Sequence, residues 1–311
     1  MAVNKNGIVV MGAVFVDIKG FPDDVYIPDG RNAGKVEYIH GGVSRNVVED
    51  IANMELRPTF LSIVDESALG DAVVRKLNNH KVNTEYIQSA PNGMGTWLAV
   101  FDNNGDLAGS ISQRPDLMPL LDVLAKKGDE IFANADSIII EVDVDKEIVK
   151  KVVELCEKHQ RKLYGVVSNM SIAVERRDFL QKFDCFICNQ LEAGMFFADD
   201  FSETAPKELA EILAKKLQLA KIPSMVVTMG GAGSVYADMK GKKGFCPAKK
   251  VQVKDTTGAG DAFCAGVSSG LTYGKTLAEA VEIGTRLAAS VITSSENVCP
   301  RFLPGELGIE A

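Results

Sequence analysis

The stretch 253–271 places three small residues, Gly258-Ala259-Gly260, directly in front of an acid, Asp261. An apolar, small-residue segment follows at once, which predicts that a helix begins here. The first N–H groups of a helix have no intrahelical partner, and with the helix dipole they bind anions. Glycines let such a backbone approach a ligand closely. Gly258, Ala259 and Gly260 are therefore candidates for an anion site.

Asp261 has two interpretations. A carboxylate beside an anion site can act as a general base, because it needs only hydrogen-bond reach to a hydroxyl group. An acid in the first turn of a helix can also serve as a cap or offset the dipole. Taken alone, the stretch leaves both interpretations open.

Other polar and glycine-rich positions also follow apolar runs. Asp17 comes after the run 8–15, the pair Gly41-Gly42 precedes a helical pattern, and "CNQLEAG" (188–194) follows another apolar run. Each has an ordinary explanation, namely an Asx-turn, a turn glycine or a helix cap. In open α/β sheets, however, ligands bind beyond the carboxyl ends of the strands.

Most of the chain alternates strand-like and helical patterns. Runs such as 136–143 and 224–230 are largely apolar, which is typical of parallel strands covered by helices on both faces. The expected fold class is α/β with a mainly parallel sheet. Expected strands are 8–15, 59–65, 136–143, 161–168, 185–189 and 224–230, and expected helices are 44–54, 71–80, 146–159, 177–183, 206–220, 258–271 and 277–292.

Two segments interrupt this alternation. Asn104-Gly105 between two strand-like runs indicates a β-hairpin. The segment 17–40 is rich in Gly, Pro and Asp. Neither is long enough to fold alone, so we expect one small β lid formed by about 17–40 and 95–112 on a single domain spanning 1–311.

Composition limits the class of partner. The chain has 34 Lys and Arg against 42 Asp and Glu, a net charge of −8, without a basic block. This argues against a nucleic-acid partner but not against a small nucleoside or nucleotide. No apolar run approaches the roughly 20 residues that cross a bilayer. The N-terminus is expected to be a buried strand rather than a signal peptide, with a cytoplasmic location and no membrane partner.

Six cysteines do not predict a disulfide framework. Cys185 and Cys188 form a C-x-x-C, but no second pair has the spacing of a zinc site. Both lie in an apolar, strand-like run, so we interpret them as buried hydrophobic residues.

The stretch "DTTGAGDAFCAG" (255–266) closely resembles the C-terminal signature of the PfkB or ribokinase family of carbohydrate and nucleoside kinases. The resemblance implies a ribokinase-like three-layer sandwich, with Asp261 as the general base. Gly258, Ala259 and Gly260 would form the anion hole for the transferred phosphoryl group. Phosphoryl transfer depends mostly on such positioning and charge stabilisation.

The resemblance also implies a substrate side. Asp17 matches a family aspartate that accepts hydrogen bonds from sugar hydroxyls. Gly41 and Gly42 match a glycine pair that approaches the substrate, and Asn46 matches an asparagine that binds a hydroxyl. Val43-Ser44 stand where ribokinases usually carry Lys-Gly, which argues against a simple ribokinase.

A nucleotide side follows from the same comparison. Asn189 and Glu192 resemble the family's Asn-x-x-Glu motif, which implies ATP and Mg²⁺, the metal held through water. Asp255 and Thr257 match positions near a monovalent-cation site, which implies K⁺ in some relatives. Residues matching the ATP-binding turn and the segment over the adenine are Thr228, Gly230, Gly231, Gly233 and Asn297.

Within the family, "VDIKGFP" and "NAGKVEYIHGGVSRNV" are most similar to the pseudouridine kinase branch. The implied reaction is phosphorylation of the 5′-hydroxyl of pseudouridine. Asn32 and Arg45 match branch-typical positions, although Arg45 could instead be a surface salt-bridge partner. In the lid, Thr96 and Trp97 are further candidates for contact with the substrate, although a tryptophan here more often belongs to the lid core or a dimer contact.

Alternatives remain open at this point. A free sugar such as ribose or another nucleoside could be the substrate, or the fold could serve a non-catalytic ligand sensor. A dinucleotide-dependent oxidoreductase is disfavoured because no G-x-G-x-x-G follows the first strand. An exposed lid sheet also predicts a homodimer through the lid.

Overall fold

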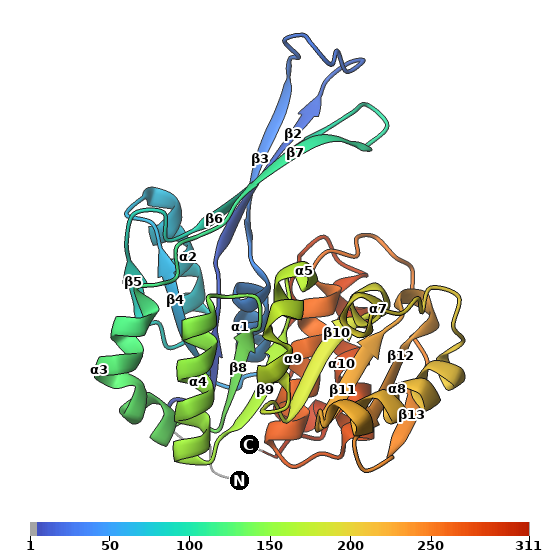
Figure 1. The fold of residues 1–311 in the computed structure, drawn as a ribbon. Coiled ribbons are helices and arrows are strands. Elements are labelled where there is room, and N and C mark those ends of the chain that lie inside the picture. The colour runs from blue at the N-terminus through green and yellow to red at the C-terminus, as the bar shows by residue number, and fades with distance from the viewer. Residues whose placement is uncertain (1–4, 311) are drawn as a thin grey trace.

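The structure is a computed structural model that describes residues 5–310. Its main sheet is formed by β1 (Ile8–Met11), β4 (Thr59–Val64), β5 (Ile87–Ser89), β8 (Ser137–Glu141), β9 (Lys162–Val166), β10 (Cys185–Asn189), β11 (Ser224–Thr228), β12 (Ser234–Asp238) and β13 (Lys243–Cys246). Within the described residues the strand order is β13-β12-β11-β10-β9-β8-β1-β4-β5 (Figure 1). Neighbouring strands run parallel from β5 to β11, and only the edge strands β12 and β13 are antiparallel.

Helices cover both faces of this sheet (Figure 1). One face carries α1 (Val43–Asn53), α2 (Ala68–Asn79), α9 (Ala259–Thr272) and α10 (Leu277–Val291). The other face carries α3 (Leu120–Ala133), α4 (Lys146–His159), α5 (Met170–Ala173), α6 (Arg177–Leu180), α7 (Gln190–Phe197) and α8 (Pro206–Ala220). Three short 3-10 turns complete the described chain: η1 (Val174–Arg176), η2 (Gly230–Ala232) and η3 (Pro304–Leu307).

Alternate side chains of the central strands fill two separate cores. Val9 and Met11 of β1 belong to the core under α3 and α4, whereas Ile8 and Val10 belong to the core under α1 and α9. Successive strand residues point to opposite faces, so an entirely apolar strand must be covered on both sides. The predicted three-layer α/β fold is confirmed.

The apolar run 8–15, expected as one strand, is divided between two sheets. β1 ends at Met11, and β2 begins at Phe15. Between them, Gly12 passes so close to Ser44 and to the carboxylate of Glu141 that a Cβ atom would overlap both. The break therefore brings the end of β1 against two polar side chains before the chain enters the second sheet.

The second sheet projects from the body (Figure 1). It consists of β3 (Gly34–Gly41), β2 (Phe15–Pro22), β6 (Gly95–Phe101) and β7 (Leu107–Gln113), in that order. These strands come from the two segments predicted to form a lid, and we call this sheet the lid. The turn after β6 has Gly105 at φ 84°, a conformation that favours glycine.

The strand registers give the lid two different faces. One cross-strand row consists of Ile39, Asp17, Trp97 and Ser112. The next row, on the opposite face, consists of Tyr38, Ile18, Leu98 and Ile111. We call these the inner and the outer face, because Asp17 and Trp97 face the cleft described below.

Cys185 and Cys188 are buried, unpaired thiols in β10, in agreement with the interpretation of the C-x-x-C as packing residues. Burial raises the pKa of Cys185 to about 12, so its reactive thiolate is not populated near neutrality. In the part of the chain that the structure describes, no helix is long and apolar enough to span a membrane.

Candidate active site

A cleft of about 760 Å³ lies between the inner face of the lid and the carboxyl ends of β1 and β8. Elements from all parts of the chain reach it. The residues predicted from sequence that line the cleft are Asp17, Gly41, Gly42, Asn46, Thr257, Asp261 and Asn297. The cleft therefore brings together most of the predicted substrate side and the N-terminal turn of α9.

The N-terminus of α9 carries the features of an anion site. Gly258 precedes the helix at φ 80°, and a Cβ atom there would overlap the carbonyl oxygen of Asn297. Only glycine fits this position without strain. The N–H of Ala259 donates to the carbonyl of Thr256 at 3.2 Å, and no side chain caps the helix, so the first-turn N–H groups have no side-chain partner. Such N–H groups and the helix dipole favour a negatively charged ligand.

Asp261 is held at this end of α9 by a residue from the other half of the chain. The amide Nδ2 of Asn46, in the first turn of α1, donates a 2.6 Å hydrogen bond to Oδ2 of Asp261. Asn46 is only 5% exposed, and its Oδ1 atom has no hydrogen-bond partner among the described residues. A buried acceptor without a partner costs free energy, which a ligand hydroxyl can recover.

The surroundings of Asp261 bring the pKa of its carboxyl group close to neutral pH. Burial raises the pKa of Asp261 to about 7, and the like charge of Glu192 acts in the same direction. The hydrogen bond from Asn46 and the charge of Arg45 lower it. A carboxylate with a pKa near 7 can take up a proton from a bound hydroxyl group and release it again.

Asp17 lies in β2, on the inner face of the lid. A Cβ atom on Gly41 would lie 2.8 Å from Oδ1 of Asp17, so only the bare backbone of a glycine leaves room for this carboxylate. Burial raises the pKa of Asp17, and the charges of Lys19 and Arg45 lower it. Asp17 and Asp261 thus present acceptors from two elements to one cleft.

Glu141 and Asp143 also line the cleft and were not among the sequence candidates, whereas Trp97, which lines it too, was one of two lid residues considered as substrate contacts. Glu141, at the end of β8, accepts hydrogen bonds from the backbone N–H groups of Ala13 at 2.8 Å and Ser44 at 3.1 Å. Burial and the nearby charge of Asp143 raise the pKa of Glu141 to about 8. An acid that ends the otherwise apolar run "SIIIE" is the signal that could have identified it.

Trp97 faces the cleft next to Asp17, with Lys19 above its ring at 5.9 Å and Phe101 against its edge. Asp143 also lines the cleft and accepts hydrogen bonds from the N–H and the hydroxyl of Ser168. The side chain of Arg114 donates to the carbonyl of Asp143 and so ties the end of the lid to the body.

Asn189 and Glu192 form a reciprocal capping box at the start of α7. Oδ1 of Asn189 accepts from the N–H of Glu192 at 2.8 Å, and Oε2 of Glu192 accepts from the N–H of Asn189 at 2.7 Å. The other oxygen of Glu192 lies outside this box. The negative charge of Glu192 raises the pKa of Asp261, so Glu192 contributes to the electrostatic environment of that carboxylate.

The donor set fits a hydrated magnesium ion better than a fully protein-bound one. No group of three or more His, Cys, Asp or Glu side chains that could hold a metal occurs within residues 5–310. Magnesium keeps several of its waters and is commonly held through one or two carboxylates and the substrate phosphates. Glu192 can meet that requirement, with Asn189 beside it.

The predicted nucleotide-binding turn lies at the end of β11. Thr228 is the last residue of this strand, and Gly230 and Gly231 are exposed in η2. Gly233 is buried at φ 103°, where a Cβ atom would overlap the carbonyl oxygen of Cys246. Gly233 is therefore required for the close backbone packing of this turn, while the other three residues remain accessible to a ligand.

Some predicted residues lie elsewhere. Asn32 bonds only to its own lid loop, through Ile27 and Gly30. Thr96 is on the outer face of the lid, one position from Trp97. Asn297, expected over the adenine, donates to the carbonyl of His40 at 3.0 Å and lines the cleft beside Asp261.

The structure also shows the surroundings of Arg45 and Asp255, and those of Arg45 differ from the prediction. Arg45 is 1% exposed and makes its hydrogen bonds within the protein, so it is neither a surface partner nor a lining residue of the cleft. Asp255 is exposed, and its Oδ1 accepts from the N–H of Thr257 at 2.8 Å. This contact lowers the pKa of Asp255 and keeps its carboxylate ionised beside the cleft.

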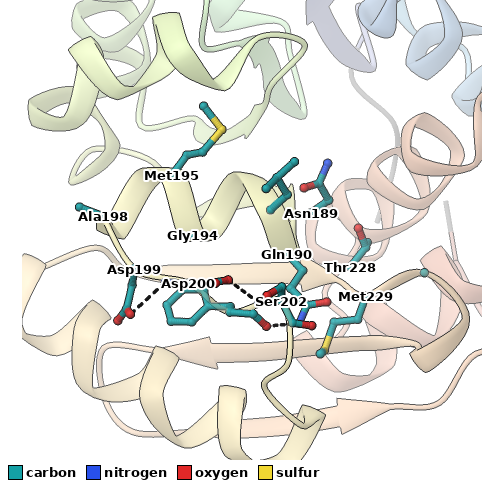
Figure 2. A pocket seen from close by; sticks show the side chains of 13 residues that line it. Asn189, Gln190, Gly194, Met195, Ala198, Asp199, Asp200, Ser202, Thr228 and Met229 are labelled. Atoms are coloured by element: carbon teal, nitrogen blue, oxygen red, sulfur yellow. Dashed lines mark hydrogen bonds between the residues drawn. The ribbon is translucent and has the colours of Figure 1, made fainter. Parts of the chain in front are cut away.

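A larger cavity, of about 920 Å³, is lined by residues that include Asn189 and Thr228 (Figure 2). Its wall contains Met195 of α7 and the segment 199–202. Gln190 closes this wall by donating to the carbonyls of Phe201 and Ser202. The Asn46–Asp261 pair does not line this cavity and lies in the smaller cleft.

Comparison with known proteins agrees with this geometry. The chain belongs to the pfkB family of carbohydrate kinases, whose family description matches residues 5–299. It is 35% identical over 294 residues to the guanosine-inosine kinase of Exiguobacterium acetylicum, covering 94% of this chain and 96% of that protein. It is 25% identical to the pseudouridine kinase of Escherichia coli K12, covering 89% and 87% of the two chains.

Among solved structures, the chain is similar to Arabidopsis thaliana ribokinase complexed with ribose and ATP. The TM-score is 0.84 at 19% identity, with 98% of this chain and 99% of that chain covered. The predicted ribokinase-like fold and the PfkB family membership are thereby confirmed.

The Asn46–Asp261 hydrogen bond should be measurable directly. Replacing Asn46 with Ala removes a donor that favours the ionised carboxylate, so the pKa of Asp261 should rise further above its ordinary value. Titration of the Asp261 carboxyl carbon by NMR measures the change. The control Asn32→Ala, in the lid loop, should leave that pKa unchanged; an unchanged or lower pKa in Asn46→Ala contradicts the assignment.

Proposed function

We propose that this PfkB-family kinase transfers the γ-phosphoryl group of ATP to a hydroxyl group of a nucleoside, with Asp261 as the general base. The observation that carries the proposal is the Asn46–Asp261 pair at the uncapped N-terminus of α9. It offers the hydroxyl an acceptor for its proton at Asp261 and a second, unpartnered acceptor at Asn46. The adjacent N–H groups provide for the negative charge of the phosphoryl group.

The proposed step balances as follows. The substrate oxygen attacks the γ-phosphorus, a new O–P bond forms, and the bond from the γ-phosphorus to the β,γ-bridging oxygen breaks to release ADP. The hydroxyl proton passes to Asp261. The backbone of Gly258, Ala259 and Gly260 stabilises the charge on the transferred group. Magnesium supplies neutralisation of phosphate charge when it is bound near Asn189 and Glu192.

The substrate side supports a nucleoside over a free sugar. Asp17 is placed to accept from ribose hydroxyls, and Trp97 adjoins it on the same face of the lid. A ribose held at Asp17 therefore brings an attached base towards an aromatic ring, which can stack on it. A free sugar would leave this surface unused.

Two kinds of nucleoside are the leading candidates, a 6-oxopurine nucleoside and pseudouridine. The pseudouridine predicted from sequence has support from a relative with 25% identity, whereas 35% identity to a guanosine-inosine kinase favours a purine nucleoside carrying a 6-oxo group. We therefore place guanosine and inosine before pseudouridine. The possible monovalent-cation role of Asp255 and Thr257 stays a prediction from the family resemblance, as do the roles of Thr228, Gly230 and Gly231 at ATP.

We also propose a homodimer through the outer face of the lid. Its row of apolar side chains includes Tyr38 at 61% exposure and Ile111 at 70%, with Val36 nearby at 57%. A row of exposed apolar residues on a sheet is a surface that a second copy of the chain can cover.

Turnover on a substrate panel tests the activity. With ATP and Mg²⁺, guanosine or inosine should release ADP faster than pseudouridine, uridine or ribose. Because only the ionised carboxylate accepts a proton, kcat/KM should fall as the pH drops through about 7, the pKa of Asp261. Asp261→Asn should lower kcat by about 10²–10⁴-fold with nucleoside binding retained. Full activity of Asp261→Asn excludes it as base; binding without turnover in the wild type indicates a ligand sensor.

Trp97 distinguishes a nucleoside from a sugar. Stacking of a base on an aromatic ring contributes about 1–3 kcal/mol, so Trp97→Ala should raise KM for the nucleoside about 10-fold or more. KM for ribose, where it is accepted, should stay within about twofold, because ribose carries no base. Thr96→Ala, on the opposite face of β6, should leave both unchanged. Equal effects of Trp97→Ala on nucleoside and ribose would refute base stacking.

Sedimentation velocity tests the dimer. The wild type should sediment as a dimer at micromolar concentration, and Ile111→Lys should shift it to monomer, since a charge in an apolar contact is costly to desolvate. The matched control is Leu219→Lys, which alters an 84% exposed leucine on α8, away from the lid. A monomeric wild type contradicts the proposal.

A further inference from the structure

Arg45 carries a charge in the protein interior, where an unpaired charge would be costly in free energy. It lies in the first turn of α1, is 1% exposed, and is followed directly by Asn46. A buried charge is tolerated only when it is paired and hydrogen-bonded. The hydrogen-bond and ion-pair partners of Arg45 therefore show which part of the structure this residue holds in place.

The guanidinium of Arg45 binds the backbone at the end of β3. Its Nε donates to the carbonyl of Gly41 at 3.3 Å, and one terminal nitrogen donates to the carbonyl of His40. Asn297 donates to the same His40 carbonyl at 3.0 Å. Two successive carbonyls immediately before Gly42 are thus fixed by one planar side chain, a geometry that the fork of arginine donors suits and a lysine does not.

Glu49 neutralises Arg45 from one helical turn further along α1. The second terminal nitrogen of Arg45 lies 2.6 Å from Oε2 of Glu49, and Glu49 is fully buried. Its other oxygen lies 2.9 Å from Nζ of Lys76, on α2, and 3.7 Å from the ring of His80. Lys76 thus shares the same carboxylate as Arg45, but of these two cations it is Arg45 that donates hydrogen bonds to the turn.

The turn that Arg45 fixes is part of the candidate active site. Gly42 adopts φ 98°, and its carbonyl accepts from the N–H of Asn46 at 2.9 Å. Gly41 packs against the carboxylate of Asp17. The position of this backbone therefore decides where both Asp17 and Asn46 stand relative to Asp261. The charge of Arg45 also lowers the pKa of Asp17 and of Asp261, which supports their ionised forms.

We propose that Arg45 is a positioning residue of the active site: neutralised by Glu49, it fixes the turn at Gly41-Gly42 and so the geometry in which the reacting hydroxyl is held. The inference rests on the proposed function and assigns Arg45 a role other than the substrate contact expected from sequence. It acts through backbone carbonyls, and its side chain does not line the cleft.

Steady-state kinetics of Arg45→Met and Arg45→Lys test the proposal. Small displacements of a binding site have large effects, so Arg45→Met should raise KM for the nucleoside by about 10-fold or more, with KM for ATP within about twofold. Arg45→Lys keeps the charge but loses the two-carbonyl contact, and should raise nucleoside KM by about threefold or more. A merely structural role would lower the thermal midpoint and the active fraction without moving KM.

Lys76→Met is the matched control, because it removes the other cation on Glu49 without touching the turn. It should leave both KM values within about twofold. Hydrogen exchange provides a readout independent of activity: amide protection over residues 41–46 should fall in both Arg45 variants and stay unchanged in Lys76→Met.

The outcomes separate the two proposals. A wild type without kinase turnover contradicts the proposed function, while hydrogen exchange still tests the role of Arg45. If Arg45→Met does not fold, Arg45→Lys decides. Wild-type nucleoside KM in a folded Arg45 variant, or the same KM increase in Lys76→Met, overturns the positioning role.

Discussion

The site depends on one hydrogen bond, from Asn46 to Asp261, across 215 residues of sequence. It joins the first turn of α1 to the first turn of α9, and these two helices pack against each other on one face of the sheet. Burial alone would favour the neutral acid, and the amide and the nearby arginine bring its pKa back to about 7. The carboxylate is therefore basic enough to take a proton, and a substantial fraction of it is ionised near neutral pH.

The lid completes what the α/β body begins. The body supplies the N-terminus of α9 with Asp261 in its first turn, whereas the lid supplies Asp17 and Trp97 from neighbouring strands. Because successive residues of a strand point to opposite sides, the same four strands carry Asp17 and Trp97 on the inner face and a row of apolar side chains on the outer face. The proposed substrate site and the proposed dimer contact therefore use different side chains of one sheet.

Several features were accessible from sequence because they depend on local patterns. The alternation of apolar strands and helices predicted the three layers, and the glycine-rich segment before Asp261 predicted that a helix begins there. Other features failed for identifiable reasons. The run 8–15 was divided because Gly12 leaves no room beside Ser44 and Glu141. The helix α3 was not predicted. Thr96 and Trp97 were both considered as substrate contacts, and only Trp97 faces the cleft, because the side on which a strand residue lies follows from the register of the strand with its neighbours.

Residue type and order were sufficient to identify the kinase family, the α/β class and the acid beside the anion loop, since these rest on motifs contained within short segments. Which side chains meet was decided by the tertiary structure alone. Arg45 and Asn46 are adjacent in sequence, yet one is enclosed with Glu49 and the other reaches Asp261. The reason is geometric: consecutive residues of a helix point about 100° apart, so one turns into the protein interior and its neighbour into the cleft.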